Sequence, residues 1–450
     1  MFSTRLVLAV FLGALSISTS SLVAGTPLYR RDDDGSKNPD VIKIRDGNVD
    51  WSTGALYFIT NEPKGNKIIV GDISSDGKVA FSRAVKTRGL GAHGASTPTG
   101  PDALFSQGSI RASSAGNILA TVNAGSSTVS VFSIDPKNPI NIKQMGEPVW
   151  SSGEFPVSVA INKDGTTVCA LNGGKMNGVG CYSVRKSKGL VPVPNTQRSL
   201  YLNQTTPPTG PAGTASQLMF SDDGGHLIAS VKGTPTPAPG TPGYLAVWDV
   251  SSDGSLSQNF TTVAPPQGGM QLFSMSAIQG KNAVLVTDPA IGFEIMDLDG
   301  INGSGGNENG TLKVGTGKSA VVSIQGQKGT SWSSYSKKTN TFFLSDIGNS
   351  TITEVKVDDG LTGTIVKQYP QKAGSSTMDS EVATVEKKDF LYVLAPGTST
   401  VEVLSLEKSG EAKNFGSFSF ADAIKKAKKD ITTTSNNVQG MATYMKPEST

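Results

Sequence analysis

Histidine and cysteine are the scarcest reactive residues in this chain of 450 residues, with two of each. Cys169 and Cys181 have no third cysteine and no histidine nearby, so a zinc-type site built on them is excluded. The sequence also shows no convincing nucleophile elbow, phosphate-binding loop, His-x-x-x-His pair or acidic calcium loop. We therefore expect no metal site.

Charge is low as well, at 17% charged residues and a net charge of +3. The chain has no dense basic stripe with interleaved aromatic residues, which makes nucleic acid an unexpected partner. Abundant glycine and proline, with 52 and 24 residues, instead suit many short strands joined by turns.

Long apolar runs are missing too. The run from Leu6 to Ile17 is too short to span a bilayer, and no later run is longer. It follows Arg5 and precedes small residues, which predicts a secretory signal peptide over residues 1–25 and a secreted, extracellular protein without a membrane span. The C-terminus has no hydrophobic tail that a lipid anchor would replace. Attachment to a cell wall stays open.

Residues 26–50 read as a polar tail that contains Arg30-Arg31. The dibasic pair is either a propeptide processing site or part of a solvated charged tail. Residues 51–450 are expected to form a single domain. Asn-x-Ser/Thr sequons predict glycosylation in loops, at Asn203, Asn259, Asn302, Asn309 and Asn349.

A repeated pattern predicts the fold. Residues 155–184 read as three short strands with two turns, the first of them at Asp164-Gly165. Similar units recur, and their second strands begin near Ala55, Asn117, Thr167, His226, Ala283, Phe342 and Phe390. Seven units at intervals of about 50–60 residues predict an all-β, seven-bladed β-propeller.

The ends of the chain are expected to close this ring. The first unit lacks a convincing first strand, and residues 438–446 offer one of matching length and character. We predict that this C-terminal strand becomes the innermost strand of the first blade. A closed ring has no obligatory partner, so we expect a monomer. Just before the strand, residues 421–431 predict a short surface helix whose lysines form a solvated face or a basic docking patch.

The cysteines fall on neighbouring strands of one hairpin. In an oxidising compartment, Cys169 and Cys181 are therefore expected to form a disulfide.

The innermost strands are mostly small or apolar, with Arg111 as their clear base and Glu381 as their clear acid. Near one axis, these two residues would bind a carboxylate or carry out acid–base chemistry; the alternative is a structural ion pair. His93 lies in a long Gly/Thr/Pro loop that would cover the channel mouth, and is either a candidate base or a surface residue. His226 begins a second strand and is read as structural.

The repeats INKDGTTVCALNGG, FSDDGGHLIASVKG and SSAGNILATVNAGSSTVSVFSID resemble those of seven-bladed lactonase-type propellers. GPDALFSQGSIRASSAGN and FPVSVAINKDGT resemble in particular secreted fungal 3-carboxymuconate cyclase-like proteins. The resemblance implies a cofactor-free enzyme that interconverts a lactone and a carboxylic acid with His, Glu and Arg residues in the channel. The family's His-Pro-His-like motif reads Phe155-Pro156-Val157 here, so the imidazole is missing.

Two hypotheses follow. The first is an extracellular lactonase or muconate-cyclase-like enzyme acting on a small anionic lactone or carboxylate, with Arg111, Glu381 and His93 as candidate catalytic residues. The second is a non-catalytic, adhesin-like propeller that binds a ligand, a glycan or a host or cell surface.

Overall fold

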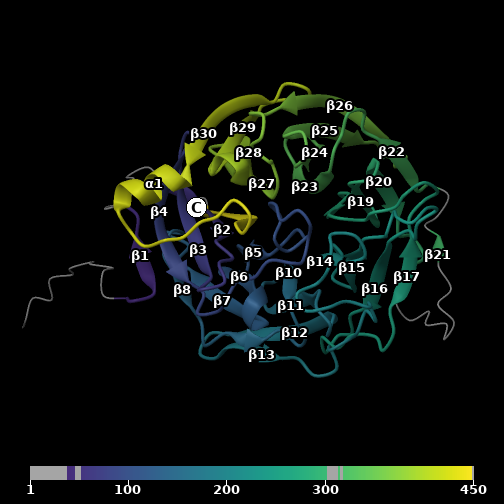
Figure 1. Cartoon of the computed structure of the whole chain (residues 1–450), viewed down its shortest axis with the longest axis horizontal. Helices are drawn as coiled ribbons and strands as arrows, with labels where there is room; N and C mark the ends of the chain where they lie inside the picture. Colours follow the sequence, from purple (N-terminus) through teal and green to yellow (C-terminus); the bar gives the residue numbers. More distant parts are fainter. Residues whose placement is uncertain (1–37, 46–51, 302–312, 315–317, 448–450) are drawn as a thin grey trace, which may run out of the picture.

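The computed structural model describes residues 38–45, 52–301, 313–314 and 318–447. Within these ranges the strands form seven sheets of four or five strands, which stand around a common centre as the blades of a propeller (Figure 1). The predicted seven-bladed β-propeller is confirmed. The predicted signal peptide, Arg30-Arg31, Asn302 and Asn309 lie outside the described residues.

The first three blades are built from strands that follow one another in the chain, except that blade 1 also contains the C-terminal strand. Blade 1 contains β1 Val41–Lys43, β2 Ser52–Ile59, β3 Lys67–Ser74, β4 Val79–Lys86 and β31 Gln439–Met445. Blade 2 contains β5 Ile110–Ser113, β6 Ile118–Asn123, β7 Thr128–Ile134, β8 Ile142–Gln144 and β9 Val149–Trp150, with the short 3-10 helix η2 Ala124–Ser126. Blade 3 contains β10 Pro156–Ile161, β11 Thr167–Asn172, β12 Gly178–Arg185 and β13 Gly189–Pro192.

The other four blades follow the same plan. Blade 4 contains β14 Ala215–Phe220, β15 His226–Val231, β16 Tyr244–Asp249, β17 Thr261–Ala264 and β21 Lys313–Val314. Blade 5 contains β18 Met275–Ala277, β19 Ala283–Asp288, β20 Gly292–Asp297 and β22 Ala320–Ser323. Blade 6 contains β23 Thr330–Ser336, β24 Thr341–Asp346, β25 Thr351–Val357 and β26 Gly363–Pro370. Blade 7 contains β27 Ser380–Val385, β28 Lys388–Ala395, β29 Thr400–Leu406 and β30 Lys413–Ser419, with the short 3-10 helix η3 Pro396–Thr398.

The C-terminal strand closes the ring as predicted. β31 pairs antiparallel with β2, and Ala55 lies opposite Tyr444. β31 also contacts the innermost strands of both neighbouring blades, β27 and β5. The last strand of the chain therefore fastens the first blade to the seventh.

Residues 41–43, which the sequence places in the polar tail, form β1 and pair with β4 at the outer edge of blade 1. Ile44, which follows this strand, is buried. Part of the tail thus contributes to the first blade.

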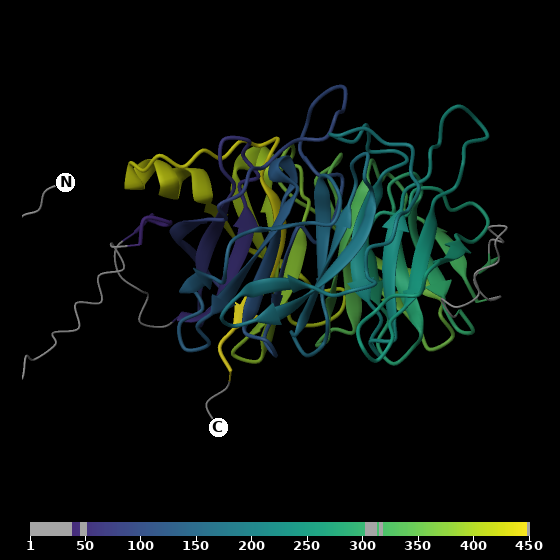
Figure 2. The ribbon, with the colours of Figure 1, turned by 90° about the horizontal axis from the view of Figure 1, so that it is seen from below.

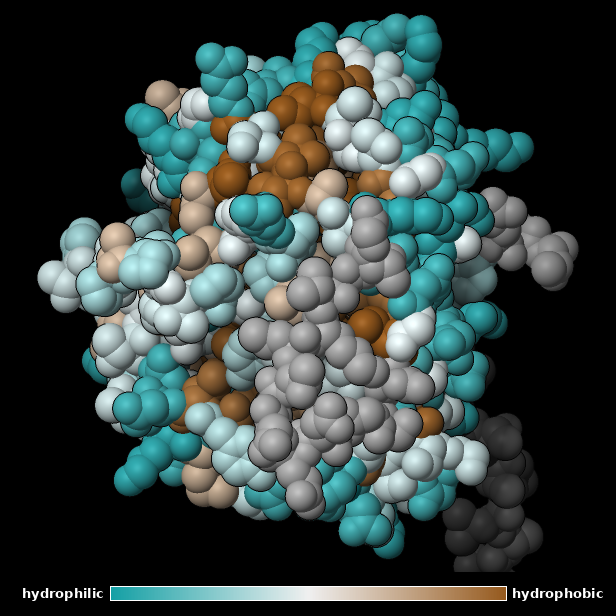
Figure 3. All heavy atoms as spheres, turned by 90° about the vertical axis from the view of Figure 1, so that its right-hand side faces the viewer, coloured by the Kyte–Doolittle hydropathy of each residue, from teal (hydrophilic) through white to brown (hydrophobic). Residues whose placement is uncertain are grey.

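The apolar core lies between the blades rather than in one central mass. The second strand of a blade is buried along its length, as in β6 and β19, because both of its faces pack against neighbouring blades. Outer strands retain exposed apolar residues, such as Ile365 and Val366 on β26. On the side of the ring that Figure 3 faces, brown apolar side chains accordingly gather among mostly teal ones.

The helix α1 Phe420–Ala427 is shorter than its prediction over residues 421–431. Ser419 caps its start by accepting a hydrogen bond from the Asp422 N–H, and Lys428 ends it in a left-handed conformation. Ile424 and Ile431 are buried. Figure 2 shows this helix on the same side of the ring as the long loops, among them the loop after β4.

Candidate functional site

One end of the central channel is closed by residues 102–108, which belong to the loop between β4 and β5. We call this segment the plug. Its polar atoms bond to the walls of several blades: Ser106 Oγ donates to Val157 O (2.8 Å), Ser216 Oγ to Phe105 O (3.2 Å), Trp332 Nε1 to Ser106 O (3.0 Å), and Gln107 Nε2 to Ser333 O (2.9 Å). Because these partners come from blades 3, 4 and 6, the plug is held across the width of the channel.

The plug also buries a cation. Lys232, on the loop after β15, donates from Nζ to Phe105 O at 2.6 Å and lies 4.7 Å from the centre of the Phe273 ring. Only 2% of this residue is exposed. Burial lowers the pKa of Lys232 to about 7, against the influence of Asp102.

Arg111 and Glu381 meet on the channel wall beside the plug. Each is the second residue of an innermost strand, β5 or β27. Arg111 Nη1 lies 3.3 Å from Glu381 Oε2, and the two side chains are 25% and 32% exposed. The prediction that these two residues lie near each other is thus confirmed. Both side chains are partly exposed, so water reaches the pair.

The environment of Glu381 favours its neutral form. Burial raises the pKa of Glu381, and the neighbouring Arg111 guanidinium opposes that rise. A raised pKa makes the ionised carboxylate a stronger base than an ordinary glutamate, which suits a role in general acid–base chemistry.

A cavity of about 580 Å³ opens beside Arg111. Its walls are the later parts of the innermost strands and the turns that follow them, and its lining includes Arg111, Lys163, Gln217, Leu218, Met219 and Gln279. The plug binds Val157 near the start of β10, whereas Val159 and Lys163 further along line the cavity. The cavity therefore lies on the side of Arg111 away from the plug.

His93 is not brought to this site. Its Nδ1 lies 2.6 Å from Gly94 O, its Nε2 lies 2.8 Å from Gly100 O, and its ring packs edge-on against Phe105. It lines a different cavity, made by loop residues such as Thr97 and Thr209. The expectation that His93 shares a pocket with Arg111 and Glu381 is not met, because Phe105 and the rest of the plug lie on the channel side of His93.

Sequence reasoning missed a buried polar cluster beneath the plug. Gln439 Nε2 faces Asp102 Oδ1 at 3.1 Å and Asp379 Oδ2 at 3.0 Å, and all three residues are at most 7% exposed. Burial raises the pKa of Asp379 to about 8 and that of Asp102 to about 6. The only signal in the sequence is position, since Asp102 and Asp379 each stand shortly before an innermost strand.

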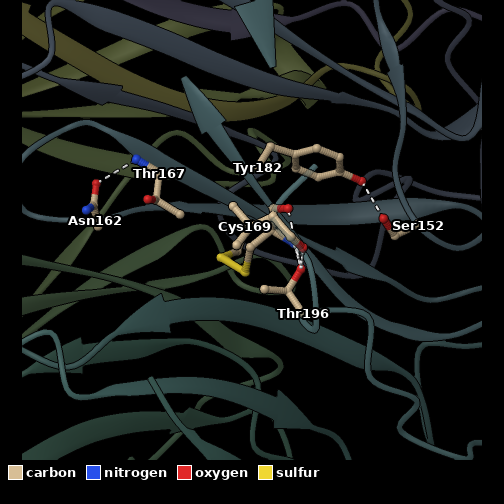
Figure 4. Close-up of a disulfide and its surroundings, with 8 residues drawn as sticks. Ser152, Asn162, Thr167, Cys169, Tyr182 and Thr196 are labelled. Carbon is tan, nitrogen blue, oxygen red and sulfur yellow. Dashed lines mark hydrogen bonds between the residues drawn. A yellow bond between two sulfur atoms is a disulfide. The ribbon is translucent and has the colours of Figure 1, made fainter. Parts of the chain in front are cut away.

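The predicted disulfide is confirmed. Cys169 on β11 and Cys181 on β12 are direct register partners, and their sulfur atoms are bonded (Figure 4). Beside them, Thr196 Oγ1 accepts a hydrogen bond from Cys181 N and donates one to Val193 O. Both cysteines are buried, so the bond is a structural link within blade 3.

The described sequons lie in loops and turns. Asn203 and Asn259 are exposed. Asn349 is partly buried, and its Nδ2 donates to Gly326 O at 2.9 Å. The atom that would carry a glycan is thus hydrogen-bonded only at Asn349 among these three.

In the described residues, no group of three or more His, Cys, Asp or Glu side chains is placed to hold a metal ion. The helices described there include none long and apolar enough to cross a membrane.

Comparison with known proteins reveals the fold and little beyond it. No protein-family model matches the sequence, and no curated protein matches it. The periplasmic gluconolactonase of Pseudomonas aeruginosa is similar in structure, with a TM-score of 0.58 at 15% identity over 88% of this chain and 99% of that one. A protein described as a 6-phosphogluconolactonase from Bacteroides fragilis gives 0.54 at 13% identity, over 89% of this chain and 100% of that one. The chain therefore has the lactonase-type seven-bladed propeller fold.

Proposed function

We propose that this chain binds a small lactone or its carboxylic acid in the cavity beside Arg111 and interconverts the two without a cofactor. The pairing of Arg111 with Glu381 at the channel wall carries the proposal. It places a fixed cation and a proton-transfer group 3.3 Å apart, and Arg111 itself lines a cavity large enough for a small ligand. The shared fold with two structures described as a 6-phosphogluconolactonase and a gluconolactonase supports it.

In this reaction Arg111 attracts the carboxylate of the acid, or stabilises the oxyanion that forms on the lactone carbonyl. Glu381 in its ionised form takes a proton from a water molecule as that water attacks the carbonyl carbon. The bond between that carbon and the ring oxygen then breaks, and Glu381 returns the proton to the ring oxygen. Lactonisation follows the same steps in reverse.

The finer proposal that the sequence resemblance supports is a 3-carboxymuconate cyclase-like substrate, an unsaturated polycarboxylic acid. This acid closes its ring without water: one carboxylate oxygen adds to a carbon of the C=C bond, and Glu381 in its neutral form gives a proton to the other carbon. Ring opening is the reverse elimination, in which Glu381 takes that proton back as the C–O bond breaks.

A second candidate is carboxylate binding without turnover. The placement of His93 outside the cavity favours it, because one carboxyl group then has to perform every proton transfer. Under this alternative Arg111 has the same role, and Glu381 only sets its position.

We propose a secreted, glycosylated protein as the setting for either function. The signal-peptide pattern, the sequons and the disulfide support this location.

The test is hydrolysis of a panel of γ- and δ-lactones by the purified protein and by three variants. Enzymatic turnover predicts a loss of at least about 100-fold in kcat/KM for Glu381→Gln and for Arg111→Gln, with His93→Ala within twofold of the wild type. Binding without turnover predicts no hydrolysis by any form, and a carboxylate affinity that only Arg111→Gln abolishes. Equal rates in all four proteins would contradict the assignment of the site.

A further inference from the structure

The first residue of the plug, Asp102, is one of two buried carboxyl groups that meet at the side chain of Gln439. Gln439, the first residue of β31, is 0% exposed, and its Nε2 faces three acceptors within 3.1 Å: Asp102 Oδ1, Asp379 Oδ2 and Ser106 O. An amide nitrogen carries only two hydrogen atoms, so these three acceptors compete. Gln439 Oε1 is buried and has no hydrogen-bond partner among the described residues.

These contacts are best satisfied when the cluster holds a proton. Two buried carboxyl groups that share one amide partner repel each other when both are ionised. A proton on one of them removes that repulsion and supplies a donor for an oxygen such as Gln439 Oε1, since the two ends of an amide are assigned from their partners.

The surrounding charges indicate which group keeps the proton. The charged or titratable groups that lower the pKa of Asp102 are Lys232, which is buried against the plug, and His93 on the outer side. The charged groups that shift the pKa of Asp379 are Asp102, which raises it, and Arg111, which lowers it. The positive charge of Lys232 therefore stabilises the ionised form of Asp102. Arg111 already faces Glu381, so Asp379 is the group left without a full partner.

We propose that Asp379, Gln439 and Asp102 form a proton-holding clasp that fixes the plug and positions Arg111 and Glu381. The clasp joins elements that lead directly into the site. Asp379 directly precedes β27 and stands two residues before Glu381, while Asp102 lies in the plug that leads into β5 and Arg111. Gly440 N donates to Asp379 Oδ2 at 2.8 Å, which ties the strand that closes the ring to the same carboxyl group.

Loss of the proton from Asp379 has two consequences. It places two like charges around Gln439, which loosens the plug from β31. It also gives Arg111 a second carboxylate to attract, in competition with Glu381 and with any anionic ligand. The first consequence is independent of the reaction; the second rests on the proposed function.

Amide hydrogen exchange tests the clasp without relying on activity. The amide of Ser106 donates to Asp102 within the plug, so it reports on whether the plug stays in place. Between pH 6 and pH 9 we expect its protection factor, corrected for the intrinsic exchange rate, to fall at least tenfold in the wild type. In Asp379→Asn, which stays neutral, we expect a fall of less than threefold. The exposed Asp359 provides a matched control, and Asp359→Asn is expected to behave like the wild type.

Unchanged protection in the wild type, or an equal fall in Asp379→Asn, would overturn the clasp. If Asp379→Asn does not fold, Gln439→Glu replaces it; this third carboxyl group is expected to lower protection already at pH 7, and wild-type protection there would overturn the clasp.

The positioning role has its own readout, the pH dependence of carboxylate binding. Affinity is expected to fall at least fivefold from pH 7 to pH 9 in the wild type and to stay within twofold in Asp379→Asn. Parallel profiles would overturn the positioning role. A protein that binds no carboxylate at any pH would refute the proposed function while leaving the exchange result to decide the clasp.

Discussion

Arg111 Nη1 and Glu381 Oε2 lie 3.3 Å apart although 270 residues separate them in the chain. The contact exists because β5 and β27 are both innermost strands, and β31 stands between them as the innermost strand of blade 1. Closure of the ring by the C-terminal strand is thus what brings the acid and the base together.

Gly440 tests the closure. Its φ is +80°, and a Cβ at this position would meet Ser109 Oγ and Ile110 Cγ2. Gly440→Ala is therefore expected to lower the free energy of unfolding by about 1–3 kcal/mol. Urea denaturation measures the loss. Gly100→Ala is the control, because a Cβ there meets nothing within 4 Å, and equal effects of the two substitutions would contradict the role of β31.

Stability is expected to fall as the pH rises from 5 to 7. The pKa of Asp379 is raised from 3.8 to about 8 and that of Asp102 to about 6, so the folded chain keeps protons that the unfolded chain has already lost. The two carboxyl groups contribute their full share to the free energy of unfolding below pH 4, and this share is lost as the pH rises through their raised pKa values. The lowered pKa of Lys232, about 7, acts in the opposite sense only above pH 7.

Urea unfolding at pH 5, 6 and 7 measures this slope. In Asp379→Asn we expect the free energy of unfolding to fall less steeply with pH than in the wild type, by up to about 1.4 kcal/mol per pH unit. Parallel curves for Asp379→Asn and the wild type would show that Asp379 holds no extra proton in the folded chain.

The disulfide between Cys169 and Cys181 closes a segment with a sequence separation of 12. A loop of this length is expected to add about 2–3 kcal/mol to the free energy of unfolding. The double variant Cys169→Ala/Cys181→Ala should show this loss in denaturant melts, and reductant should then have no further effect on it. A variant as stable as the oxidised wild type would indicate that the bond adds nothing.

We expect glycans to be attached more fully at sequons whose asparagine side chain is exposed than at those whose asparagine is partly buried. Asn203 and Asn259 are exposed in loops, while Asn349 donates from Nδ2 to Gly326 O. In a eukaryotic secretory host, Asn203→Gln and Asn259→Gln should each reduce the mass of the secreted protein by one glycan. Intact-mass spectrometry before and after deglycosylation measures this, and full occupancy at Asn349 with none at Asn203 would contradict the expected order.

The fold could be predicted from sequence because a propeller repeats one local pattern. Buried second strands recur in each blade and turns such as Asp164-Gly165 in several, and the missing first strand of blade 1 pointed to the C-terminal strand. The pairing of Arg111 with Glu381 followed from their equivalent places on innermost strands. What the pattern could not provide is the course of the long loop after β4. That loop places Phe105 between His93 and the channel, and brings Asp102 to Asp379 and Gln439.

The proposed function requires that a carboxylate binds at Arg111 in the cavity away from the plug. A crystal structure of the protein soaked with the hydroxy acid of the best-bound lactone would show this binding. We predict density for the acid in this cavity, with its carboxylate within hydrogen-bonding distance of the Arg111 guanidinium, and no such density in Arg111→Gln. Ligand bound beside His93 and Thr209 instead, or an empty cavity at saturating ligand, would contradict the account.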